Sequence, residues 1–106
     1  LAVFAGHYPE FPVLPGVLLC EAVFQAGAVL IASGGEIPEG HVPVVTRQQE
    51  TRFRRMVRPG ELLEIEASLD EVLGGAWFLS GKASVEDQVA VRLQFACTAT
   101  AVEAFR

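Results

Sequence analysis

Residues 17–32 constrain the fold more than any other part of the chain, because they predict a helix that is apolar on every side. The segment has no proline, one internal glycine and strong helix formers throughout, and only Glu21 and Gln25 interrupt its apolar run. A Ser-Gly-Gly sequence at residues 33–35 ends it. A helix without a polar face is typically buried all round. The sequence therefore predicts that the rest of the chain wraps around this helix.

The segments that follow the helix are predicted to form the strands that wrap around it. Hydrophobic and polar residues alternate in three successive stretches, as in strands with one wet face. In these stretches Leu69 and Val89 are expected to face inward, and Ala90 and Ala96 outward. The three antiparallel strands are residues 63–70, 77–85 and 89–97, with turns at Gly74-Gly75 and Glu86-Asp87, after a short strand at 1–5 and an extended stretch at 44–57. This order predicts an α+β fold in which a curved antiparallel sheet encloses one helix.

Length and composition narrow the class of protein. The chain has 106 residues, the size of one domain, and a net charge of −5, which disfavours nucleic acid as a partner. Hydrophobic residues make up 51% before the ten glycines are counted, above the roughly 45–50% usual with glycine included. A domain this small buries only part of its surface, so the surplus apolar residues are expected to lie against another subunit. We therefore expect an obligate oligomer.

The cysteines and the apolar run indicate a compartment. Cys20 and Cys97 lie in apolar runs without metal-ligand spacing and are too few for a disulfide framework, which favours a reducing, cytoplasmic location. The apolar run at residues 17–32 is shorter than the ~20 residues that span a bilayer. No membrane insertion is expected.

Glu21 is the most informative residue for function. A carboxylate in the middle of a buried apolar helix is costly unless it has a purpose or a partner. Gln25 lies one turn further along the same face and can share a hydrogen bond with it. Burial would favour the protonated carboxyl, which suits a group that donates a proton. The alternative is a buried Glu held by structural hydrogen bonds.

Two further features lie close to Glu21 in the sequence. His7, flanked by Gly6 and the Tyr8-Pro9 pair, is a candidate general base, although a lone loop histidine is more often ordinary. At Pro15-Gly16-Val17 the free backbone N–H groups of the helix start can bind an oxyanion, although this is also an ordinary helix entry. Together a base, an acid and N–H donors suit proton removal beside a carbonyl with loss of a β-hydroxyl. The second histidine, His41, is not predicted to take part in the chemistry.

Basic residues are concentrated in one segment of this acidic chain. This segment either attracts an acidic protein or a phosphate group, or forms a solvated strand face. Five of the eight basic residues are Arg47, Arg52, Arg54, Arg55 and Arg58.

The stretch from Gly6 to Ala26, GHYPEFPVLPGVLLCEAVFQA, resembles the signature of the hydroxyacyl-acyl carrier protein dehydratases, the FabZ/FabA type. The family pattern is GHFP, then PGVLxxEAxxQ, then FxRPVxPG, which stands here as FRRMVRPG at residues 53–60. The resemblance covers roughly residues 4–100. It implies the hotdog fold, which agrees with the plan deduced from periodicity, and a single domain over residues 1–106.

The resemblance also implies residue roles. His7 would remove the α-proton of a 3-hydroxyacyl thioester and Glu21 would protonate the departing hydroxyl, giving a trans-2-enoyl thioester. The backbone at Gly16 and Val17 would hold the thioester carbonyl, Gln25 would orient Glu21, and Phe24 would shape the acyl tunnel. The site would need no metal or other cofactor.

The resemblance implies partners as well. An acyl carrier protein would deliver the acyl chain on its phosphopantetheine arm, docking on Arg52, Arg54, Arg55 and Arg58. The site would be shared between subunits of a homodimer or a trimer of dimers. Relatives carry a longer segment with a strand before the GHFP element, so we expect either that an N-terminal segment is missing from this sequence or that the chain is a minimal variant. The alternatives are a hotdog thioesterase and a catalytically silent acyl-binding module.

Overall fold

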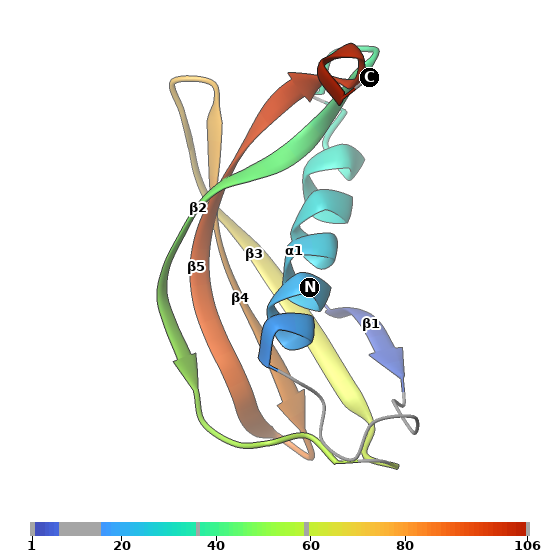
Figure 1. Ribbon diagram of the computed structural model, residues 1–106, viewed down its shortest axis with the longest axis vertical. Helices are drawn as coiled ribbons and strands as arrows, with labels where there is room; N and C mark the ends of the chain where they lie inside the picture. The colour runs from blue at the N-terminus through green and yellow to red at the C-terminus, as the bar shows by residue number, and fades with distance from the viewer. Residues whose placement is uncertain (1, 7–15, 36, 59, 106) are drawn as a thin grey trace.

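One long helix lies against the concave side of a single antiparallel sheet, as expected from the sequence (Figure 1). The computed structural model describes residues 2–6, 16–35, 37–58 and 60–105. The elements in chain order are β1 (Ala2–Gly6), α1 (Gly16–Ser33), β2 (His41–Phe53), β3 (Leu63–Leu73), β4 (Ala76–Val85), β5 (Gln88–Ala101) and the short 3-10 helix η1 (Val102–Phe105).

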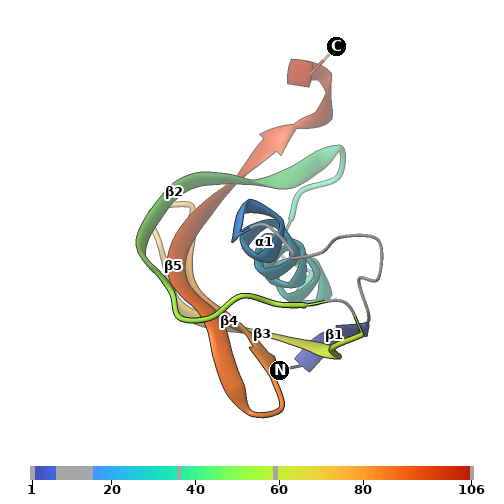
Figure 2. The same ribbon diagram turned by 60° about the horizontal axis from the view of Figure 1, so that its bottom comes forward.

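The strands are hydrogen-bonded in the order β1-β3-β4-β5-β2, so β1 and β2 form the two edges. The sheet curls around α1, with β1 and β2 on different sides of the helix (Figure 2). Because β2 pairs with β5 rather than with β3, the crossing segment between β2 and β3, described at residues 54–58 and 60–62, leads from one edge of the sheet toward the opposite edge. This crossing segment carries the second family-like motif.

Glycines allow the helix to approach the sheet closely. A Cβ at Gly81 in β4 would collide with Cγ1 of Val23, which is fully buried on α1. A Cβ at Gly27 on the helix would lie 2.7 Å from the ring of Phe95 in β5. The alternation predicted for β4 is confirmed, since every second residue from Trp77 to Val85 is buried.

Both predicted hairpin turns are confirmed. Gly74 and Gly75 have φ of 59° and 79°, and Glu86 and Asp87 have φ of 49° and 64°. Two consecutive positive φ angles give the turn geometry that matches the twist of a hairpin. Glycine adopts it freely, whereas Glu86 and Asp87 hold a backbone conformation that costs energy for residues with a side chain.

The predicted alternation fails at four positions, and a bulge in β5 explains two of them. Ala83 pairs with Val91 and Ser84 with Val89, so Ala90 is an extra residue in β5. Ala90 is fully buried instead of facing solvent, and Val89 is half-buried. Ala96 is also buried, beside its outward-facing partner Phe78, and Leu69, at 43% exposure, is not covered as expected.

The burial predicted for α1 is only partly found. Within the single chain the buried residues form one face, whereas Val17 and Val29 are 74% and 57% exposed. The curled sheet covers only part of the helix surface, so the prediction of a helix buried all round is wrong for one chain. By length and composition alone α1 could span a membrane, but its buried face belongs to the core of the domain. That face consists of Leu19, Cys20, Val23, Ala26, Gly27 and Ile31.

Candidate active site

The helix begins at Gly16, where the sequence predicts an N–H donor site. The first N–H groups of a helix have no partner within it, and the helix dipole makes this end positive. The ring of Phe53, the last residue of β2, lies against this end, and a Cβ on Gly16 would come within 2.5 Å of its Cε1 atom. Glycine at position 16 therefore allows an aromatic ring to cover the helix start.

Glu21 and Gln25 form the expected pair on α1. Gln25 Nε2 donates a hydrogen bond of 3.3 Å to Glu21 Oε1. The predicted burial is not found, because both side chains are exposed in the single chain. The hydrogen bond from the Gln25 amide holds the Glu21 carboxyl group in one orientation.

A groove of about 410 Å³ lies beside this pair, between α1 and the β2–β5 side of the sheet. Phe24 lines it and packs edge-to-face on Phe95, with ring centroids 5.0 Å apart. An apolar groove with one carboxylate–amide pair can hold an aliphatic chain and place its polar end near an acid. The residues lining the groove are Glu21, Phe24, Gln25, Ala28, Pro43, Val44, Val45 and Cys97.

His7, the predicted base, lies outside the described residues. The preceding residue, Gly6, ends β1 and pairs with Leu63 at one edge of the sheet. The groove beside Glu21 is lined by β2, the opposite edge strand. The helix lies between these two edges in Figure 2.

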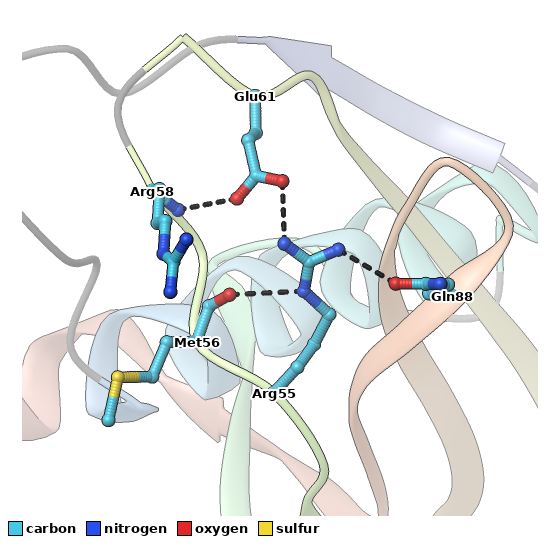
Figure 3. A network of polar contacts seen from close by, with 5 residues as sticks. All are labelled: Arg55, Met56, Arg58, Glu61 and Gln88. Atoms are coloured by element: carbon cyan, nitrogen blue, oxygen red, sulfur yellow. Dashed lines mark hydrogen bonds and ion pairs between the residues drawn. The ribbon is translucent and has the colours of Figure 1, made fainter.

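The predicted basic patch is divided by the structure. Arg55 donates to Glu61 Oε2 at 2.5 Å and to Gln88 Oε1 at 3.0 Å, so its guanidinium is engaged within the chain (Figure 3). The backbone N–H of Arg58 donates to Glu61 Oε1, at 2.7 Å. These contacts tie the crossing segment to the start of β5. Arg47, Arg52, Arg54 and Arg58 keep exposed side chains.

The contacts of Glu61 lower the pKa of its carboxyl group. The hydrogen bond from the Arg58 backbone, with the guanidinium of Arg55, holds the pKa of this carboxyl below its usual range. The family-like motif at residues 53–60 therefore continues into a structural clamp. Sequence reasoning stopped at Gly60 and missed Glu61.

The positions of two other site residues, Phe53 and Cys97, were not predicted from the sequence. Phe53 was part of a quoted motif, but nothing in the sequence indicated that it covers Gly16. Cys97 faces the groove because its register partner in β2 is Val45, and such pairings are not visible before the strand order is known. Burial raises the pKa of the Cys97 thiol to about 11, so it is a poor nucleophile.

A second thiol, Cys20, lies next to Glu21 on the helix. Burial raises the pKa of Cys20, and a weak hydrogen bond from Gln48 Nε2, 3.8 Å from its Sγ, opposes that shift. Both cysteines are free and buried. Neither thiol is therefore prepared to act as a nucleophile.

The chain is similar in sequence to a known protein family. A family model described as a FabA-like domain matches residues 1–94. The 3-hydroxyacyl-(acyl-carrier-protein) dehydratase FabZ of Coxiella burnetii is 40% identical over 93 residues, which cover 86% of this chain and 66% of that protein. A FabZ dehydratase of Verminephrobacter eiseniae is 40% identical over 101 residues, covering 93% and 67%. The chain thus spans about two thirds of the length of these curated relatives.

Solved structures share the fold. A thioesterase superfamily member from Thermus thermophilus superposes with a TM-score of 0.82 at 16% identity, covering 98% of this chain and 83% of that one. A hot-dog-like protein from Thermanaerovibrio acidaminovorans gives a TM-score of 0.75 at 17% identity, covering 89% and 67%. At such identities the likeness concerns the fold alone, and the predicted hotdog fold is confirmed.

Proposed function

The chain belongs to the FabA-like family, and from that premise we propose that it dehydrates (3R)-hydroxyacyl-acyl carrier protein thioesters to trans-2-enoyl thioesters in fatty acid biosynthesis. Relatives named as this dehydratase, 40% identical over most of the chain, support the reaction. The observation that carries the proposal is the Glu21–Gln25 pair at an apolar groove. The catalysis needs no cofactor, because the reaction is a proton removal coupled to loss of water.

In the proposed reaction His7 takes the proton from the carbon next to the thioester carbonyl. The electron pair forms the new C=C bond as the C–O bond of the β-hydroxyl breaks, and Glu21 gives its proton to the leaving oxygen. Water departs, leaving Glu21 ionised and His7 protonated. Gln25 keeps the Glu21 carboxyl directed at the groove. The backbone N–H groups of Gly16 and Val17, which have no partner within the helix, stabilise the negative charge on the thioester oxygen.

The proposed site is shared between two subunits of a homodimer or of a trimer of dimers. Two observations support a shared site. The first is that the groove beside Glu21 is lined by the edge strand β2, whereas Gly6, the residue before His7, ends the opposite edge strand β1. The second is that Val17 and Val29 on the helix are exposed in the single chain, as expected of residues that a second subunit covers.

The acyl chain is proposed to enter the groove with Phe24 limiting its depth. Its phosphopantetheine arm arrives on an acyl carrier protein that docks on the exposed arginines Arg52, Arg54 and Arg58. Arg55, held by Glu61 and Gln88, would position the crossing segment rather than touch the carrier. Two buried free cysteines and a single core helix fit a soluble protein of the reducing cytoplasm.

The test is an assay with 3-hydroxybutyryl and crotonyl thioesters, following the absorbance of the enoyl thioester. His7→Ala and Glu21→Gln should each lose activity by at least about 10²-fold, the scale of general acid–base catalysis. His41→Ala and Glu64→Gln are the matched controls and should keep it, since His41 starts β2 and Glu64 is exposed on β3.

Three results would contradict the proposal. Full activity in either site variant would remove the assigned roles. Release of free thiol without enoyl product would indicate a thioesterase. Binding of acyl thioesters by the folded parent protein without turnover would indicate a silent acyl-binding module.

A further inference from the structure

A row of positive charge crosses the outer face of the sheet, away from the helix. Lys82 of β4 pairs directly with Arg92 of β5, and Arg92 pairs directly with Arg52 of β2. Directly opposed side chains share a face and have Cβ atoms about 5 Å apart. Lys82 and Arg92 alternate with the buried residues Gly81 and Leu93, so the row lies on the convex side.

This arrangement opposes like charges on three neighbouring strands. Like charges directly opposite each other destabilise a sheet. Glu66 of β3 partly offsets Lys82 through an ion pair of 3.5 Å. Within the part of the chain that the structure describes, neither Arg92 nor Arg52 has an acidic partner. In a chain of net charge −5, two adjacent uncompensated guanidinium groups require an explanation.

A hollow of about 380 Å³ lies at this row. It exists because the short side chains of Ser68 and Ser80 lie between the longer ones around them. Its polar lining offers hydroxyl, amide, ammonium and guanidinium donors, the groups that bind phosphate oxygens. The residues lining it are Glu66, Ser68, Ser80, Gly81, Lys82, Arg92, Leu93 and Gln94.

We propose that this hollow binds a small phosphorylated ligand, with Arg92 as the main contact and Lys82 beside it. The volume is within the range of roughly 300–1,000 Å³ typical of small-molecule sites. The Ser80 hydroxyl donates to Asp70 Oδ1 at 3.1 Å, so that end of the hollow is the less favourable for an anion. The phosphate therefore lies toward Arg92 and Gln94. The bound anion relieves the repulsion between the opposed cations.

This site is separate from the groove beside Glu21. The groove is lined by α1 and by inward-facing residues such as Cys97, whereas Lys82 and Arg92 face outward from the same sheet. The proposal thus does not depend on the proposed dehydratase activity. Binding at the hollow is expected whether or not the protein turns over acyl thioesters.

The test titrates the protein with inorganic phosphate and with pyrophosphate at constant ionic strength, following backbone amide shifts by NMR and the Tm. Saturable shifts are expected at residues 80–82 and 92–94, with a rise in Tm. Arg92→Gln should weaken binding by at least about tenfold, the effect of losing a charged hydrogen-bond donor. It should also raise the Tm measured without phosphate, because it removes the like-charge pairs.

Three further variants sharpen the result. Lys82→Gln should weaken binding in the same way, and Glu66→Gln should strengthen it by freeing Lys82. Arg47→Gln is the matched control: Arg47 is an exposed β2 arginine paired with Ala96, four residues along β5 from Arg92. It changes the net charge equally and should leave binding unaltered.

Equal responses of the Arg92→Gln and Arg47→Gln proteins would overturn the proposal, since they would show general charge screening. Shifts that do not saturate would overturn it too. Binding to phosphatidylcholine vesicles containing phosphatidylglycerol, with no response to free phosphate or pyrophosphate, would indicate a membrane surface instead of a small ligand.

Discussion

Gly16 at the start of α1 and Phe53 at the end of β2 are packed so closely that a Cβ at position 16 would collide with the aromatic ring. A Cβ there would lie 2.5 Å from Cε1 and 2.9 Å from Cζ of the Phe53 ring. The contact joins the two family-like motifs, since Gly16 belongs to the first and Phe53 opens the second. It also covers the helix end at which the proposed oxyanion site lies.

Gly16→Ala is therefore expected to displace the Phe53 ring. Because that ring is 56% exposed and can move, the loss of stability should be modest, about 1 kcal/mol. Under the proposed function, kcat/KM should also fall while the protein remains folded, because the helix start that binds the thioester oxygen is disturbed. Chemical denaturation and the enoyl assay measure the two effects.

The double variant Gly16→Ala/Phe53→Ala provides the control. Residues in contact have a coupling energy of about 0.5–3 kcal/mol, so the two changes should not be additive. Additive effects on stability would show that the ring does not limit position 16.

The clamp formed by Arg55, Arg58 and Glu61 should make the fold sensitive to acid. The contacts of Glu61 lower its pKa in the folded protein, so the folded state holds this proton less tightly than the unfolded chain does. Its stabilising contribution is complete above the ordinary Glu pKa of about 4.3 and is lost as the pH falls through the lowered value. Glu61→Gln should flatten that part of a plot of unfolding free energy against pH.

Glu64→Gln is the matched control for this acid sensitivity, because Glu64 is an exposed carboxylate on β3, three residues away. It should leave the slope below about pH 4.3 unchanged. The same slope in the parent protein and in Glu61→Gln would mean that the clamp does not contribute to acid stability.

The general plan of this fold was predictable because its periodicities are strong. The strong helix formers in residues 17–32 predict a helix, the alternation in β4 predicts a strand with one buried face, and Gly74-Gly75 predicts a hairpin turn. The burial of Ala90 was not predictable, because a single bulge residue shifts the alternation. Such a shift depends on pairing with the next strand, which the sequence of one strand does not contain.

The candidate site was predictable where it is local in sequence. Glu21 and Gln25 are four residues apart on a helix, and their hydrogen bond follows from helix geometry. Their exposure was not predicted, since the face that a sheet covers depends on how far it curls around the helix. Cys97 and Val45 reach the groove through strand pairing between distant segments.

Cys97 should react slowly with thiol reagents although it faces the groove. Its pKa of about 11 leaves very little thiolate at pH 8, whereas an unfolded thiol titrates near ~8.5. Alkylation by iodoacetamide should therefore be at least about 10²-fold slower in the native protein than in guanidinium chloride.

A Cys20→Ser background isolates this thiol for the alkylation measurement. In that background a native rate equal to the denatured rate would show that the Cys97 thiol is not shielded from solvent. It would also place the groove wall in a more open state than the packing beside Phe24 indicates.

Phe24 is expected to set the length of acyl chain that the groove accepts. Its edge-to-face contact with Phe95 fixes the ring against β5, where it forms part of the groove wall. Phe24→Ala should remove this contact, lower stability by about 1–3 kcal/mol and extend the space next to Ala28. Under the proposed function, the ratio of kcat/KM for eight-carbon over four-carbon 3-hydroxyacyl thioesters should rise by about tenfold or more, since each buried CH₂ contributes about 0.8 kcal/mol.

Phe78→Ala is the matched control for Phe24, because Phe78 is a half-buried phenylalanine that lies opposite Ala96 on the outer face of β4. It should lower stability to a similar extent and leave the chain-length ratio unchanged. The comparison separates a specific change in groove depth from a general loss of stability. A ratio that rises equally in both variants, or in neither, would show that Phe24 does not limit the acyl chain.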